Sequence, residues 1–192
     1  MKELKKMDLI DFERRKKYLN IKMEIMNSNL LFDFTVNKEN MTIEIKREFN
    51  AGLKLVWQAW TTPELLDQWW GPQPWRAETK TMDFRVGGFW LYAMVSPEGE
   101  RHYARTNFIS IVTEKSFASK GGFSDENGTI NPAFPVNLWE NNFIEVGDRV
   151  RVDMLLTYDS LADLETEIEM GFKEGMTVDF QQLDELLLTL TK

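Results

Sequence analysis

The stretch MDFRVGGFWLYAMV, residues 82–95, decides how the fold of this sequence is interpreted. Two adjacent glycines, Gly87 and Gly88, interrupt a run of bulky side chains, and glycine adopts the positive φ angles that tight strand connections need. The apolar residues after them alternate as Trp90, Tyr92 and Met94 against Leu91, Ala93 and Val95. Successive strand residues point to opposite faces of a sheet. Because both sets are apolar, the pattern predicts a strand over 89–95 that is buried on both faces.

The flanking segments carry further strand signals. Residues 42–49, TIEIKREF, alternate isoleucines with charged residues, which is typical of a half-buried strand. Five more strands are expected near 76–83, 102–111, 115–122, 137–145 and 149–158. Short turns such as PEGE, residues 97–100, connect neighbouring strands. Strands joined by hairpins form an antiparallel sheet, so the sequence predicts seven antiparallel strands.

Helical signals follow the first strand and reappear near the C-terminus. Residues 50–72 predict two short helices, the second of which starts at Pro63 with Thr62 as its N-cap. Ser160 and Asp163 form a capping pair that predicts the start of a further helix.

The last helix determines the predicted architecture. Gly171 and Gly175 are expected to separate the helix after residue 160 from a longer one over about 173–190. One stripe of the longer helix is apolar: Met176, Phe180, Leu183, Leu187 and Leu190. This stripe must be covered by the apolar face of the sheet. The predicted fold class is therefore α+β, with a curved seven-stranded antiparallel sheet wrapped around the long C-terminal helix.

Three segments together resemble a known family. They are REFNAGLKLVWQAWTTPELLDQWWGP (47–72), MDFRVGGFW (82–90) and EMGFKEGM (169–176). In this order they are similar to SRPBCC domains related to the activator of heat-shock protein 90 ATPase, within the START-like helix-grip superfamily that includes the birch pollen allergen. The resemblance covers about 41–190 and implies an apolar cavity between the sheet and the long helix. The sequence departs from the pattern at Gly52, where many relatives have proline.

The 192 residues divide on these signals into an N-terminal extension over 1–40 and a START-like helix-grip domain over 41–192. The extension is expected to be partly helical or flexible. A nucleic-acid-binding or membrane-surface arm is one alternative, and a true translation start at Met23 or Met26 is another. The net charge of −8 disfavours a nucleic-acid partner for the domain, because phosphate neutralisation drives such binding.

Composition limits the chemistry that the chain can support. The chain has no cysteine, which excludes disulfides and thiolate ligands and suits a cytoplasmic location. His102 is the only histidine, so the composition disfavours a transition-metal site and a Ser-His-Asp triad. No window is apolar enough for a membrane span, and no secretory signal is visible. We therefore expect no metal, no cofactor, no catalytic residues and no membrane partner.

Two groups of charged residues are given structural roles. Asp83 and Arg85 are expected to fix the turn before the paired glycines. The acidic cluster Asp163, Glu165, Glu167 and Glu169 is expected to be a solvated surface. Alternate residues on a helix do not share a face, so the cluster is not a metal cage.

The candidate ligand-binding residues surround the implied cavity. They are Trp70, Trp75, Trp90, Tyr92, Met94, Tyr103, Arg105, Phe117, Met154, Met176, Phe180 and Leu183. Ordinary core packing is the alternative for the apolar members. Tyr92, Tyr103 or Arg105 would orient the polar part of a ligand, and Arg105 would suit an acidic group.

Three functions stay open on these observations. The first is binding of an apolar or amphipathic small molecule in the cavity. The second, suggested by the family name, is modulation of a chaperone ATPase through an exposed patch, and a homodimer also fits the resemblance. The third is an enzyme of the cyclase, dehydratase or hydrolase kind, which predicts a titratable residue with a displaced pKa inside the cavity. No catalytic motif is visible, so binding is the preferred interpretation.

Overall fold

The structure, a computed structural model, describes residues 30–191 of the chain. One sheet holds eight antiparallel strands in the order β1-β2-β8-β7-β6-β5-β4-β3. The strands are β1 (Phe32–Asn37), β2 (Thr42–Phe49), β3 (Arg76–Met82), β4 (Phe89–Val95), β5 (Arg101–Val112), β6 (Ser116–Ser124), β7 (Val136–Val146) and β8 (Arg149–Tyr158). The helices are α2 (Leu53–Thr61), α3 (Pro63–Trp69), α4 (Leu161–Glu169) and α5 (Phe172–Leu190). The α+β class is confirmed.

The predicted strand count was wrong by one. Seven strands occupy the predicted segments, with ends that differ by at most two residues. The eighth, β1, is an edge strand that pairs antiparallel with β2, and the sequence analysis had placed its residues in the N-terminal extension. Its sequence, FDFTVN, does alternate, but most of its residues are exposed, so the strand depends on pairing with β2. Residues 1–29 of the predicted extension lie outside the described residues.

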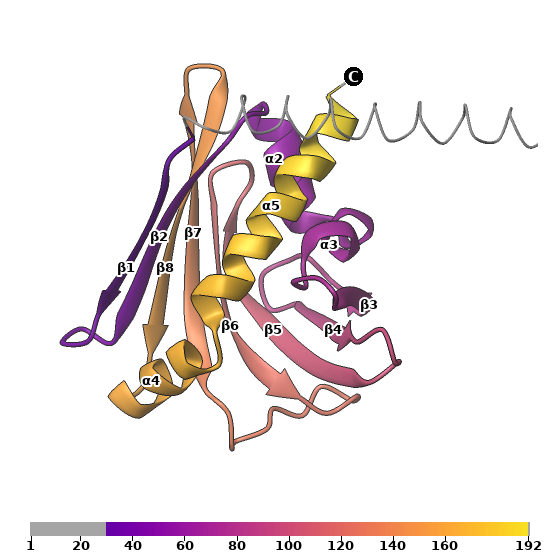
Figure 1. The fold of residues 1–192 in the computed structure, drawn as a ribbon, viewed down its shortest axis with the longest axis vertical. Coiled ribbons are helices and arrows are strands. Elements are labelled where there is room, and N and C mark those ends of the chain that lie inside the picture. Colours follow the sequence, from indigo (N-terminus) through magenta and orange to yellow (C-terminus); the bar gives the residue numbers. More distant parts are fainter. Residues whose placement is uncertain (1–29, 192) are drawn as a thin grey trace, which may run out of the picture. The chain divides into compact units, whose positions relative to one another are not determined.

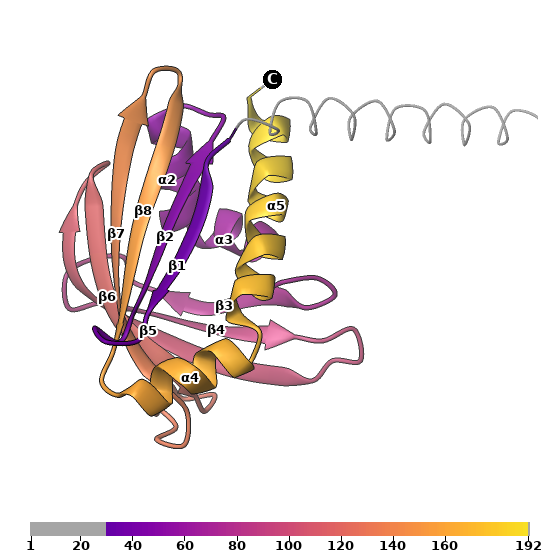
Figure 2. The same ribbon diagram turned by 60° about the vertical axis from the view of Figure 1, so that its left-hand side comes forward.

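The sheet and α5 form the predicted helix grip. Figures 1 and 2 show the sheet curving around α5, which lies across its concave face. Helices α2 and α3 lie on the same side of the sheet as α5. The interior of the domain therefore lies between these three helices and the concave face.

The two C-terminal helices begin for different local reasons. The Oγ atom of Ser160 accepts a hydrogen bond from the backbone N–H of Asp163 at 3.1 Å, which confirms the predicted cap of α4. Gly171 has a φ of 81° and separates α4 from α5. The predicted break at Gly175 was wrong, because that residue lies inside α5. A single glycine costs a helix only about 1 kcal/mol, which packing of the helix offsets.

The paired glycines before β4 have separate roles. Gly87 has a φ of 80°, as the connection between β3 and β4 requires. A Cβ atom on Gly88 would lie 2.1 Å from the carbonyl oxygen of Asp83, so only glycine fits there. After the glycines, β4 is buried on both faces, as predicted.

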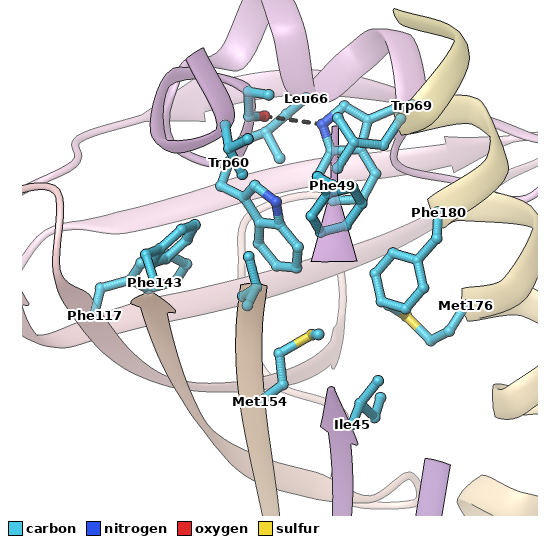
Figure 3. Close-up of a cluster of buried hydrophobic side chains, with 14 of the residues drawn as sticks. Ile45, Phe49, Trp60, Leu66, Trp69, Phe117, Phe143, Met154, Met176 and Phe180 are labelled. Atoms are coloured by element: carbon cyan, nitrogen blue, oxygen red, sulfur yellow. Dashed lines mark hydrogen bonds between the residues drawn. The ribbon is translucent and has the colours of Figure 1, made fainter. Parts of the chain in front are cut away.

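Aromatic rings fill the interior beneath the helices, as Figure 3 shows. The ring centroids of Trp60 on α2 and Trp69 on α3 are 5.0 Å apart. The indole N–H of Trp69 donates to the backbone oxygen of Ala59 at 2.8 Å, which is the dashed line in Figure 3. Phe180 on α5 packs edge-on against Phe49 on β2, with centroids 5.8 Å apart. These contacts join the helices to one another and to the sheet.

A buried ion pair attaches the C-terminal half of α5 to the sheet. Arg47 on β2 and Asp184 on α5 form a salt bridge, and the two residues are 7% and 6% exposed. Burial raises the pKa of Asp184, although the positive charge of Arg47 opposes that shift. Since each buried charge depends on the other, the pair favours one position of α5 against β2.

Among residues 30–191, no helix has both the length and the apolar character needed to cross a membrane. The same residues contain no group of three or more histidines or carboxylates arranged to hold a metal ion.

Candidate ligand cavity

A cavity of about 340 Å³ lies between the N-terminal half of α5 and strands β4 to β7. The strands line it with Trp90, Tyr92, Met94, Ala104, Thr106, Phe108, Phe117, Ser119, Gly121, Asn137, Trp139 and Asn141. The helices and their connections contribute Trp60, Trp70, Pro72, Glu167, Met170, Phe172, Gly175, Met176 and Asp179. Small-molecule sites commonly measure about 300–1,000 Å³, so this cavity suits a small ligand.

Several of the cavity-lining positions on β5 and β6 carry small side chains, which leave space between the larger ones. Ala104 on β5 lies opposite the large side chain of Tyr92 on β4, and Thr106 lies opposite Trp90. On β6, Gly121 lies opposite Thr106. Protein interiors are close-packed, so a row of small residues beneath a helix leaves a cavity where no neighbour fills it.

Five aromatic side chains of the cavity lining form a continuous chain. Trp90 and Tyr92 are stacked with centroids 3.9 Å apart. Trp70 lies 5.9 Å from Trp90 and 5.9 Å from Trp139, and Trp139 lies 5.9 Å from Phe172, centroid to centroid. The indole N–H of Trp70 donates to the Tyr92 hydroxyl at 3.0 Å, which holds these two side chains together.

Three buried polar atoms belong to side chains that line the cavity and have no hydrogen-bond partner within residues 30–191. They are Nε1 of Trp60, Oδ1 of Asn141 and Oδ1 of Asp179. These residues are 4%, 1% and 3% exposed. An unmade buried hydrogen bond costs about 1–3 kcal/mol, so a ligand that supplied the missing partners would gain affinity.

Two carboxyl groups line the cavity, and burial changes their titration. Burial raises the pKa of Asp179 to about 8, and a hydrogen bond from the Gly71 backbone acts in the opposite direction. Burial also raises the pKa of Glu167 to about 7. The pKa of the Tyr92 hydroxyl is raised chiefly by burial and further by the charges of Asp179 and Glu167, which therefore lie near it. Both carboxyls thus act on the same end of the aromatic chain.

The prediction of a solvated acidic surface on α4 was wrong for Glu167. Asp163 donates its backbone N–H to the Ser160 cap of α4, Glu165 pairs with Lys38 at 2.8 Å on the surface, and Glu169 is exposed. Glu167 instead is partly buried and lines the cavity. Because alternate helix residues do not share a face, one member of such a cluster can point inward when the helix covers a cavity.

The structure divides the twelve predicted ligand-binding residues into two equal sets. Six line the cavity: Trp70, Trp90, Tyr92, Met94, Phe117 and Met176. The other six do not: Trp75, Tyr103, Arg105, Met154, Phe180 and Leu183. As contacts to a ligand, the twelve residues stay predictions.

Tyr103 and Arg105 lie on the face of β5 away from the cavity. Ala104, Thr106 and Phe108 are alternate residues of β5, and all three line the cavity. The residues between them therefore point to the opposite face of the sheet. The guanidinium of Arg105 donates to Oδ1 of Asn107 at 3.0 Å and to the backbone oxygen of Gly128 at 3.4 Å. These contacts hold its positive charge outside the cavity.

The remaining four residues lie in closed packing or near the surface. Met154, Phe180 and Leu183 are at most 2% exposed and belong to the packed core. The ring of Trp75 lies 5.0 Å from that of His102, centroid to centroid. His102 itself is exposed, and its Nε2 atom lies 2.7 Å from Oε1 of Glu100. The single histidine therefore lies outside the cavity.

Sequence reasoning missed the polar part of the cavity wall, namely Asp179, Glu167 and Asn141. One signal was available for Asp179, because it follows Met176 by three residues and so extends the apolar stripe of the last helix. An acidic residue within an apolar helical stripe is a candidate buried polar group. Nothing in the local pattern around Asn141 marks it as buried.

Comparison with known proteins places the chain in a family. The family model described as "Activator of Hsp90 ATPase homolog 1-like protein" matches residues 50–188. A comparison with curated proteins finds no match.

Several solved structures share the fold. The solution structure of a protein from Arthrobacter aurescens is 30% identical, with a TM-score of 0.77 over 82% of this chain and 91% of that one. A crystal structure of a Mycobacterium smegmatis protein is 30% identical, with a TM-score of 0.75 over 82% and 96% of the two chains. A Nitrosomonas europaea protein is 26% identical, with a TM-score of 0.70 over 79% and 97%. The chain therefore belongs to the Activator of Hsp90 ATPase homolog 1-like family, and its described part has the helix-grip fold.

Proposed function

We propose that the protein binds an apolar or amphipathic small molecule in the cavity beneath the N-terminal half of α5. The observation that carries this proposal is an aromatic wall of five rings combined with three buried polar atoms that lack partners. Burial of apolar ligand surface contributes about 25 cal/mol per Å². The polar atoms of Trp60, Asn141 and Asp179 would then orient the ligand.

Intrinsic fluorescence offers a direct test, because Trp60, Trp70, Trp90 and Trp139 all line the cavity. A library of lipids and aromatic compounds is screened by tryptophan fluorescence, and hits are checked by native mass spectrometry. We expect saturable binding with one ligand per chain. Absence of saturable binding across the whole library would contradict the proposal.

A pair of variants shows where a ligand binds. Ala104→Leu adds bulk inside the cavity and is expected to abolish binding. Ala118→Leu makes the same change on β6 at a position that does not line the cavity, so its binding should match that of the unmodified protein. Equal binding by the two variants would place the ligand elsewhere.

A second candidate function is catalysis by the cavity carboxyls. Burial raises the pKa values of Asp179 and Glu167 to about 8 and about 7, and general acids and bases work best with a pKa near the working pH. The test is to incubate each bound compound with the protein and to look for conversion by mass spectrometry. Conversion that is lost in Asp179→Asn would support catalysis, whereas unchanged recovery of every ligand supports binding alone.

The family description also suggests modulation of a chaperone ATPase, and the resemblance suggests a homodimer; both are proposals for this chain. ATPase stimulation that persists in Ala104→Leu would assign the chaperone effect to a surface outside the cavity. Sedimentation analysis of the purified protein tests the homodimer.

A further inference from the structure

We propose that the ligand carries a basic nitrogen, and that its ammonium group binds beside the Asp179 and Glu167 carboxyls against the aromatic faces of the cavity. This inference rests on the proposed binding function and names the chemical class of the ligand. An alkylamine or an aralkylamine with an apolar body is the simplest member of that class.

The side chain of Asp179 is the first reason for this assignment. The residue is 3% exposed and lines the cavity, and its Oδ1 atom has no hydrogen-bond partner within residues 30–191. A buried carboxyl oxygen is an acceptor, and a charged N–H is the donor that forms its strongest hydrogen bond. An ammonium group satisfies this oxygen, whereas a carboxylate ligand would repel it.

The charge of the cavity wall is the second reason. Both ionisable carboxyls, Asp179 and Glu167, line the cavity, while no lysine, arginine or histidine lines it within the described part of the chain. Arg47 pairs with Asp184, and Arg105 lies on the outer face of β5, where it donates to the backbone oxygen of Gly128. The ionisable groups of the cavity wall are therefore all acidic, and a cationic ligand would supply the counter-charge of a carboxylate that ionises on binding.

The aromatic chain is the third reason. Trp70, Trp90, Tyr92, Trp139 and Phe172 all line the cavity and follow one another at centroid distances of 3.9–5.9 Å. The face of an aromatic ring attracts a cation, and tryptophan does so most strongly. Aromatic rings that line a site together with a carboxyl are typical of sites that recognise alkylammonium groups.

Binding of an ammonium group changes the protonation of the wall. The ligand keeps its own proton, and the Asp179 carboxyl releases one proton to solvent when it becomes the counter-ion. The titratable groups near this site are Glu167 on α4, Tyr92 on β4 and, beyond Glu167, Tyr158 on β8. The tyrosines stay neutral, because burial raises the pKa of both hydroxyls well above the usual range.

Three probes of equal length separate charge from apolar burial. Octylamine, 1-octanol and octanoate are titrated into the protein at pH 7, with calorimetry and tryptophan fluorescence as readouts. A charge-assisted hydrogen bond is expected to make octylamine bind about 10- to 100-fold more tightly than 1-octanol. Octanoate should bind most weakly. Calorimetry in two buffers with different ionisation enthalpies should show proton release with octylamine and none with 1-octanol.

Two matched variants test whether Asp179 causes the preference for an amine. Asp179→Asn keeps the shape of the side chain and should remove the advantage of octylamine over 1-octanol while leaving 1-octanol affinity within about 3-fold, because only the charge-assisted bond is lost. Glu169→Gln removes an exposed charge from α4 and should change neither affinity. Retained 1-octanol binding also shows that the Asp179→Asn protein is folded.

Two results overturn the inference and differ in what they say of the proposed function. If 1-octanol or octanoate binds as tightly as octylamine, or if Asp179→Asn keeps the preference for octylamine, the basic-nitrogen assignment is wrong while ligand binding stands. If none of the three probes binds and the wider library also shows no saturable binding, both proposals fail.

Discussion

The two halves of α5 meet the sheet in different ways. In the C-terminal half, Leu183 and Leu187 are 0% and 2% exposed, and Asp184 pairs with Arg47. In the N-terminal half, Met176 and Asp179 are just as buried, at 3% each, but they line a cavity of about 340 Å³. Equal burial of the helix therefore accompanies closed packing at one end and open space at the other.

The difference originates in the strands. In the closed part of the core, β2 and β8 bury large side chains such as Ile45, Val152 and Met154. Around the cavity, β5 and β6 place the small Ala104 and Ser119 beside the aromatic Phe108 and Phe117. A helix of ordinary amphipathic character thus encloses a cavity wherever the sheet provides small residues beneath it.

The largest expected effect concerns the closed half. Asp184→Ala leaves the Arg47 guanidinium buried without its carboxylate, and loss of one partner of a buried ion pair costs about 3–5 kcal/mol. Urea unfolding followed by tryptophan fluorescence measures this loss. The double variant Arg47→Met with Asp184→Leu removes both charges and should recover most of the stability. A loss below about 1 kcal/mol in Asp184→Ala would show that the pair does not hold this half together.

The next effect compares enlargement of one buried side chain in each half. Val152→Leu adds bulk at a position that is 0% exposed, and overpacking of a filled core costs about 1–3 kcal/mol. Ala104→Leu adds more atoms, but these enter the cavity, so its cost should stay below about 1 kcal/mol. Thermal and urea unfolding of the two variants give the comparison. If both variants lost the same free energy of unfolding, the space beside Ala104 would not be open to the larger side chain, because the cavity wall would have rearranged to fill it.

A third effect is the dependence of stability on pH. The pKa of Asp179 is about 8 in the folded protein against 3.8 as its ordinary value, and that of Glu167 is about 7 against 4.5. At a pH between the ordinary and the raised pKa of each group, the folded protein keeps a proton that the unfolded chain has released. Rising pH therefore favours unfolding. We expect the free energy of unfolding to fall between about pH 5 and pH 8, by at most about 1.4 kcal/mol per pH unit for each group.

Urea unfolding at several pH values measures that slope. Asp179→Asn should reduce the slope, because the variant has no carboxyl to ionise at that position, while Glu167 and Asp184 still contribute to it. Glu169→Gln, which removes an exposed carboxyl, should leave the slope unchanged. The same slope in Asp179→Asn and the unmodified protein would rule out Asp179 as its source.

The smallest expected change in stability concerns α2, which serves as a control region outside α5. Gly52 is the N-cap of α2 and has φ −71° and ψ 154°. Proline adopts this φ, and no atom lies within 4 Å of a Cβ placed there. Gly52→Pro should therefore stabilise the protein by about 0.4–1 kcal/mol through the unfolded state. Ligand affinity should not change. A lower unfolding temperature for Gly52→Pro would show that proline does not fit the backbone at this position.

Local patterns were enough to place most elements. The Ser160 cap and the alternation over 89–95 each depend on residues close together in the chain, and both predictions were confirmed. The strand β1 was missed because its exposed face gives a weak signal and its pairing with β2 supplies most of its order.

The orientation of β5 shows where such patterns fail. Residues 102–108, HYARTNF, carry polar side chains in both alternating sets, so hydrophobicity does not tell which set points inward. Pairing of Ala104 with Tyr92 on β4 decides this, and it turns Tyr103 and Arg105 away from the cavity. Of the six predicted ligand-binding residues that lie outside the cavity, these two are excluded by the orientation of β5.

Short-range spacing in the chain settled the fold class, the long amphipathic helix and the antiparallel sheet, since helix and strand periods are properties of neighbouring residues. The cavity and its two carboxyls depended on tertiary packing. Asp179 accepts a hydrogen bond from the backbone of the distant Gly71 and acts electrostatically on Tyr92, and Glu167 reaches the same cavity from a different helix. Which polar groups are buried together, and with which partners, follows from residues far apart in the chain, and no local pattern contains that information.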